Sequence, residues 1–113
     1  MINIQFIRKQ STIVSVELSG HADSGPYGYD IVCAAVSALT IGAVNSLIAL
    51  ADISLDVQTT NEEGGYLKLT LPEKLTNKQM ERAQLLLDSL HLSLSSTQEE
   101  YGEHMTIKNI NNE

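Results

Sequence analysis

A long segment without charge constrains the fold of this chain more than any other feature. From Ile31 to Ala51 the sequence contains no Asp, Glu, Lys or Arg, and the segment is flanked by Asp30 and Asp52. An apolar segment of this length is sufficient to span a bilayer. However, it contains several small polar residues and lacks the basic or aromatic anchors expected at the two membrane faces. We therefore expect no membrane span, but a helix buried on most sides within a small protein or against a second subunit.

The spacing of large apolar residues predicts which side of this helix is buried. The preceding segment, from Gly20 to Tyr29, contains three glycines and a proline and is typical of a loop. Asp30 then fits the N-cap position of a helix over about 31–51. The predicted buried stripe, at spacings of three or four, consists of Val32, Val36, Leu39, Ala43, Leu47 and Leu50.

Alternation of apolar and polar residues predicts five strands elsewhere. A polar turn at 8–11 joins the first two strands into a hairpin, and a Gly-Gly turn at 60–65 precedes the fourth. The tail from Asn109 to Glu113 is polar and is expected to fray. The residues of the alternating apolar faces are Ile2, Ile4 and Phe6; Val14, Val16 and Leu18; and Leu67, Leu69 and Leu71. Leu55 and Val57 suggest the third strand, and Met105 and Ile107 a last one.

A capping box marks the start of a second amphipathic helix. Thr76 and Gln79 have the required spacing, and the helix is expected to end near Ser95. Its predicted buried stripe is Met80, Ala83, Leu87, Leu90 and Leu94. The element order is therefore β-β-α-β-β-α-β. This order predicts a single α+β domain over residues 1–113, a two-layer sandwich with a mainly antiparallel sheet and two long helices on one face.

Composition excludes several functional classes. The chain has 14 acidic and 7 basic residues, a formal charge of −7, one cysteine and 4% aromatic residues. This acidity argues against direct nucleic-acid binding. One cysteine excludes an internal disulfide framework or a multi-thiolate metal site. No secretory leader pattern is present at the start, so we expect a cytoplasmic protein.

The chemistry-bearing residues are Cys33 and His21. On the predicted boundaries Cys33 lies in the first helical turn, where free N–H groups and the helix dipole favour a thiolate. His21 lies at the end of a strand, across the glycine-rich loop, where an imidazole could accept the thiol proton. A lone cysteine in an alanine-rich helix is nevertheless often an inert packing residue, and a lone histidine at a strand end is often a surface residue.

Two neighbouring residues have alternative interpretations. Asp30 either caps the helix or orients His21, as the third group of a catalytic triad does. Ser37 lies one turn beyond Cys33 and either hydrogen-bonds near the sulfur or donates to the Cys33 carbonyl. A metal site at His21, Asp30 and Cys33 would lack the second Cys/His pair typical of structural zinc, so we expect no metal or other cofactor.

These residues also carry a family resemblance. Gly20-His21-Ala22, the glycine-rich loop and the segment DIVCAAVS at 30–37 resemble the signature of the Prp family, the ribosomal-processing cysteine proteases (YsxB-like proteins). The long helix of small residues, the Gly-Gly turn and the second helix extend the resemblance over nearly the whole chain.

The resemblance implies that Cys33 is the nucleophile and His21 the general base and acid, with Gly20, Asp30 and Ser37 in supporting roles. It implies a homodimer whose substrate is the precursor of a large-subunit ribosomal protein, from which a short N-terminal extension is removed beside an aromatic pair. The net negative charge would attract such a basic substrate.

We further expect the 22–29 loop to act as a lid over the bound peptide. Its candidate substrate-contacting residues are Gly25, Tyr27, Gly28 and Tyr29. Helix-start N–H groups near Cys33 could stabilise the oxyanion. The alternative function is a non-catalytic factor that binds a ribosomal protein or assembles the ribosome, with Cys33 in the core. A redox thiol would need a resolving cysteine from another chain.

Overall fold

Five strands form one mixed, mostly antiparallel sheet in the order β3-β4-β2-β1-β5. The computed structural model describes residues 1–20, 25–60 and 65–112, and at 25–30 the backbone alone. The predicted α+β class and the order β-β-α-β-β-α-β are confirmed. The elements are β1 (Ile2–Lys9), β2 (Thr12–Gly20), α1 (Gly25–Leu50), β3 (Asp56–Thr59), β4 (Tyr66–Thr70), α2 (Asn77–Tyr101) and β5 (Met105–Asn111).

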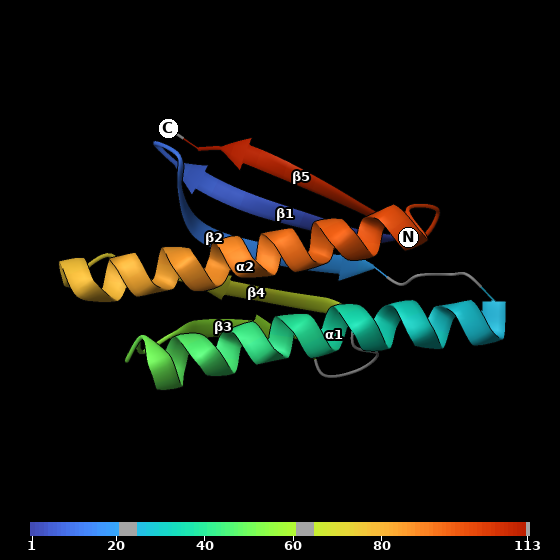
Figure 1. The fold of residues 1–113 in the computed structure, drawn as a ribbon, viewed down its shortest axis with the longest axis horizontal. Coiled ribbons are helices and arrows are strands. Elements are labelled where there is room, and N and C mark those ends of the chain that lie inside the picture. Colours follow the sequence, from blue (N-terminus) through green and yellow to red (C-terminus); the bar gives the residue numbers. More distant parts are fainter. Residues whose placement is uncertain (21–24, 61–64, 113) are drawn as a thin grey trace.

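Both helices pack against the same face of the sheet. Figure 1 shows α1 and α2 side by side and running in opposite directions, with α1 toward β3 and β4 and α2 toward β1 and β2. One continuous core joins the inward sheet residues to the buried faces of both helices. Its fully buried large side chains include Phe6, Ile4, Ile13, Val16, Val32, Leu47, Leu69, Leu87, Leu94 and Met105.

The hairpin between β1 and β2 has a tight turn and a bulge. Gln10 and Ser11 both have positive φ, 53° and 70°, as a two-residue turn compatible with strand twist requires. The register shifts between Ile7 and Arg8. Because of this shift Ile13 enters the core, whereas Val14, predicted to point inward, is half-buried.

Helix α2 confirms the predicted capping box and buried stripe. The Thr76 hydroxyl accepts from the Gln79 N–H at 3.1 Å, and the Gln79 side chain accepts from the Thr76 N–H at 2.9 Å. The helix continues past the predicted end at Ser95 to Tyr101. In this extension the Ser96 and Thr97 hydroxyls donate to carbonyls one turn earlier, which satisfies polar groups that would otherwise favour a turn.

The predicted frayed tail is wrong for Asn109–Asn111. These residues continue β5, which pairs in parallel with β1. Arg8 Nε donates to Asn109 Oδ1 at 3.0 Å, and the Asn112 N–H donates to the Arg8 carbonyl at 2.7 Å. The tail is therefore held by β1, a segment far away in the sequence.

Helix α1 is buried on one side rather than on most sides. Val32, Val36 and Leu47 are buried, and Leu39 and Ala43 are half-buried against the core. Leu50, predicted to be buried, is 61% exposed. By length and composition Ile31–Leu50 could cross a membrane. In this fold, however, its buried face belongs to the core shared with α2 and the sheet.

Candidate active site

The start of α1 differs from the sequence prediction and changes the setting of Cys33. The helix begins at Gly25 instead of Ile31, so Asp30 lies within the helix and is not its N-cap. Pro26 is compatible with the first turn, where an amide hydrogen is not needed, and a glycine within a helix costs only ~1 kcal/mol. The residues that are typical of a loop are therefore also able to begin a helix.

Two mechanistic expectations change with this boundary. Cys33 lies about 12 Å beyond Gly25 along the helix, at ~1.5 Å per residue. The dipole effect fades within the first turn, so Cys33 lies outside the region where the helix dipole and the free N–H groups of the helix start act. The predicted loop is also wrong for residues 25–29, because Gly25, Tyr27, Gly28 and Tyr29 have helical backbone. Closure of this segment over a bound peptide stays a prediction.

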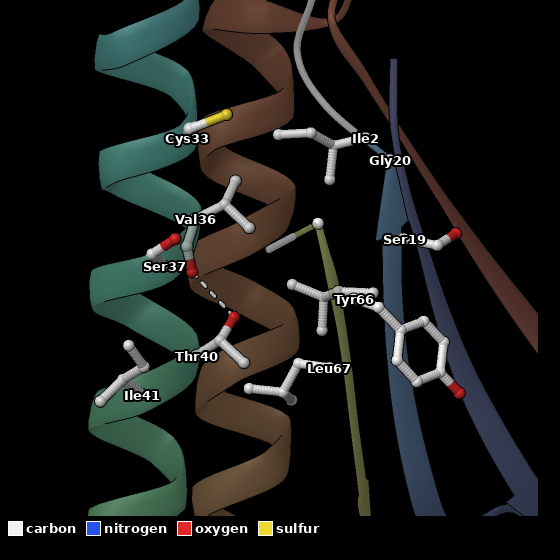
Figure 2. Close-up of a pocket in the computed structure, with 12 residues that line it drawn as sticks. Ile2, Ser19, Gly20, Cys33, Val36, Ser37, Thr40, Ile41, Tyr66 and Leu67 are labelled. Atoms are coloured by element: carbon white, nitrogen blue, oxygen red, sulfur yellow. Dashed lines mark hydrogen bonds between the residues drawn. The ribbon is translucent and has the colours of Figure 1, made fainter. Parts of the chain in front are cut away.

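Cys33 is a free, half-buried cysteine on the wall of a cleft with a volume of about 290 Å³. In Figure 2 its sulfur points from α1 across the cleft toward Ile2. The helical wall is formed by residues at intervals of three and four along α1, which places them on one face. These residues are Cys33, Val36, Ser37, Thr40 and Ile41.

The opposite wall is formed by the sheet. Ile2, Leu18 and Leu67 contribute apolar side chains from three adjacent strands. The side chains of Ser19 and Tyr66 point away from α1, so these residues border the cleft through their backbone (Figure 2). None of the cleft-lining residues within the described ranges is charged.

Gly20 and Gly65 close the sheet side of the cleft. The Gly20 N–H donates to the Gly65 carbonyl at 2.8 Å. Gly20 has a φ of +91°, and a Cβ at this position would lie 2.3 Å from the Met1 carbonyl oxygen. Glycine is therefore required at the end of β2, directly before His21 in the sequence.

The two hydroxyl residues of the helical wall differ in their hydrogen bonds. Thr40 is buried and donates to the Val36 carbonyl at 2.8 Å. Ser37 is exposed at the rim, and within the described residues its hydroxyl has no partner. Neither of the two hydrogen bonds considered for Ser37 from the sequence, to the Cys33 sulfur or carbonyl, is therefore present.

The other predicted site residues are only partly covered by the structure. His21 lies outside the described residues, as do residues 22–24 of the predicted lid, and the Asp30 side chain is not described. Within the described residues no group of His, Cys, Asp and Glu could hold a metal ion. The cleft residues that the sequence analysis missed as site residues, such as Leu18, Thr40 and Leu67, carry no motif and meet only through strand pairing and helix packing.

Comparison with known proteins decides the family. Residues 1–106 match the family model described as cysteine protease Prp. The chain belongs to the Prp family of cysteine proteases. It is 37% identical to the ribosomal processing cysteine protease Prp of Bacillus subtilis, over 84% of each chain.

Solved structures of similar chains share the whole fold. The SMU.848 protein from Streptococcus mutans is 44% identical, with a TM-score of 0.86 over 99% of this chain and 96% of that one. The ribosomal processing protease Prp from S. aureus, solved with a covalently linked product peptide, is 32% identical, with a TM-score of 0.83 over 96% and 99%. The family resemblance found in the sequence is thus confirmed, and the chain is a Prp cysteine protease.

Proposed function

We propose that this Prp protease cleaves a peptide bond by attack of the Cys33 thiolate, with His21 as general base and acid. The observation that carries the proposal is the position of Cys33, the one cysteine of the chain, on a cleft whose opposite wall ends at Gly20, the residue before His21. Because His21 directly follows Gly20 in the sequence, this arrangement supports a histidine as the base for the thiol.

The reaction proceeds in two steps. His21 accepts the thiol proton, the sulfur attacks the scissile carbonyl, and the protonated imidazole then protonates the leaving amine as the peptide bond breaks. Water adds to the resulting thioester, His21 accepts its proton, and the acid is released as the proton returns to the sulfur. No cofactor takes part in either step.

Three residues have proposed supporting roles. Gly20 allows the end of β2 to lie close to Met1, directly before His21 in the sequence. Asp30, now a helical residue, orients His21. The Ser37 hydroxyl, which has no partner within the described part of the chain, is available to hydrogen-bond a bound peptide at the rim of the cleft. Contact of the substrate with Gly25, Tyr27, Gly28 and Tyr29 would occur on the first turns of α1.

The proposed substrate is the precursor of a large-subunit ribosomal protein, which loses a short N-terminal extension in the cytoplasm. Family membership supports this substrate, as does the product peptide bound by the S. aureus relative. The formal charge of −7 favours encounter with a basic partner.

We also propose that the one-domain chain acts as a homodimer. Two large apolar side chains are well exposed, Leu50 at the end of α1 by 61% and Leu85 on α2 by 71%, and such apolar exposure favours association. Leu85→Glu is expected to convert the dimer to monomer in size-exclusion chromatography with light scattering.

The deciding experiment is incubation of the enzyme with the ribosomal protein precursor, read by mass spectrometry. The wild type should release the extension, whereas Cys33→Ala should bind the precursor and leave it intact. His21→Ala should slow release by a factor of about 10²–10⁴, the usual contribution of a general acid–base. Circular dichroism of each variant checks that it is folded. Cleavage at the normal rate by Cys33→Ala would exclude this nucleophile.

Alkylation of Cys33 against pH separates the enzyme from a purely binding protein. A thiol paired with His21 should react readily at about pH 6, and His21→Ala should shift the profile toward that of an ordinary cysteine. An inert thiol in both proteins would instead favour the alternative of a non-catalytic ribosomal-protein-binding factor.

A further inference from the structure

The cleft continues well beyond the thiol. Cys33 and Ile2 lie at one end, and Ile41, Thr40 and Leu67 lie at the other (Figure 2). The two ends of the helical wall are about 12 Å apart, at ~1.5 Å per residue along α1. An extended peptide advances by ~3.3 Å per residue, so this distance corresponds to three or four peptide residues.

The far end of the cleft is apolar. The Thr40 hydroxyl is directed to the Val36 carbonyl, and in Figure 2 its methyl group faces Leu67. Leu67 is half-buried against the core, whereas Ile41 is 53% exposed at the outer edge. A ligand side chain placed here would cover Ile41 and complete the packing on Leu67, which is favourable for an apolar group and unfavourable for a charged one.

We infer that Ile41 and Leu67 are specificity-determining residues, forming a subsite for an apolar side chain three or four residues away from the scissile bond. This inference rests on the proposed role of Cys33, because that role fixes where the scissile bond lies. The cleft volume of about 290 Å³ lies at the small end of the range for ligand pockets, so it suits a short peptide segment.

The chain offers a matched control for Ile41. Ile48 lies two turns further along α1 with nearly the same exposure, 49%, but does not line the cleft. Ile41→Ala and Ile48→Ala remove the same atoms from the same helix, so only the former should change substrate selection. Because both side chains are about half exposed, both variants are expected to fold. Leu67→Val tests the second subsite residue, Leu67, with a smaller loss of volume, because this side chain is half-buried in the core.

The experiment uses peptides spanning the cleavage site of the ribosomal protein precursor. At each position up to four residues on either side of the scissile bond, the native residue is replaced in separate peptides by alanine, by leucine and by aspartate. The alanine peptide is the reference for that position. For the wild type, leucine at one position three or four residues away should raise kcat/KM about tenfold or more over alanine, and aspartate should lower it. The preference should be lost in Ile41→Ala, reduced in Leu67→Val and retained in Ile48→Ala.

A binding measurement keeps this inference separate from the nucleophile assignment. Fluorescence anisotropy of the same labelled peptides with Cys33→Ala, alone and combined with Ile41→Ala, reports recognition without turnover. If Cys33→Ala still cleaved, the proposed nucleophile would fail, while the binding preference could still be measured. If Ile41→Ala and the wild type preferred the same side chains in both assays, the subsite would not be at Ile41.

Discussion

Replacing Gly20 with alanine would place a methyl group where the structure has no room for one. The added Cβ would lie 2.3 Å from the Met1 carbonyl oxygen, a backbone atom that cannot move by rotating a side chain. The φ of +91° is also disfavoured for any residue with a Cβ, at a cost of ~1–2 kcal/mol. Relief of the contact by a backbone shift adds strain of ~1–3 kcal/mol. We therefore expect Gly20→Ala to lower the free energy of unfolding by about 2–5 kcal/mol.

Urea denaturation followed by far-ultraviolet circular dichroism measures this loss directly. In thermal unfolding, at roughly 4 °C per kcal/mol for a chain of this size, Tm should fall by about 8–20 °C. Ser19→Ala is the control, because the side chain of Ser19 points away from the cleft in Figure 2, and its effect should stay within ~0.5 kcal/mol. If Gly20→Ala were as stable as Ser19→Ala, the argument from the Met1 contact and the positive φ would be refuted.

Three further predictions concern α2 and the outer face of the sheet. Thr76→Ala should lower the free energy of unfolding by ~1 kcal/mol through loss of the helix cap, whereas Thr76→Ser should retain most of it, as measured by urea denaturation. Leu94→Ala should cost ~2–5 kcal/mol because Leu94 is fully buried, whereas Leu92→Ala, at a position 69% exposed, should stay within ~0.5 kcal/mol; equal effects would contradict the assigned helix face. The hydrogen bond from the Tyr66 hydroxyl to Glu17 at 2.6 Å raises the pKa of Tyr66 above 10.0, so its stabilising effect is complete below pH 10 and is lost as the pH rises through the raised pKa. Glu17→Gln should lower that pKa in an ultraviolet absorbance titration, and an unchanged titration would exclude Glu17 as the cause.

Local signals in the sequence were sufficient to predict most of the helices and strands. The Thr76–Gln79 capping box and the apolar spacing from Ala83 to Leu94 predicted the start and the buried face of α2 correctly, because both depend on residues a few positions apart. The last residues of β5 were missed because their partner is β1, at the other end of the chain. Asn109 is not a typical strand residue, and its place is set by pairing with Phe6 and a hydrogen bond from Arg8.

The candidate site was predicted less completely. Cys33, Ser37 and Gly20 were singled out and do line one cleft. Leu18 and Leu67 were predicted only as inward strand residues, because their meeting opposite α1 depends on the pairing of β2 with β4. Strand register and helix packing are long-range features that alternation within one segment does not encode.

The early start of α1 determines where the chemistry of Cys33 has to come from. With the helix N-terminus about 12 Å away, Cys33 lies beyond the first turn, over which the helix dipole acts. Within the described residues the lining of the cleft is apolar, hydroxyl-bearing or backbone, so none of those side chains is a base strong enough to accept the thiol proton. If Cys33 is the nucleophile, its proton acceptor is not among the described lining residues, and His21, which directly follows the cleft-lining Gly20 in the sequence, is the proposed base. The changed helix boundary thus makes the proposed mechanism depend more strongly on His21 than the sequence alone implied.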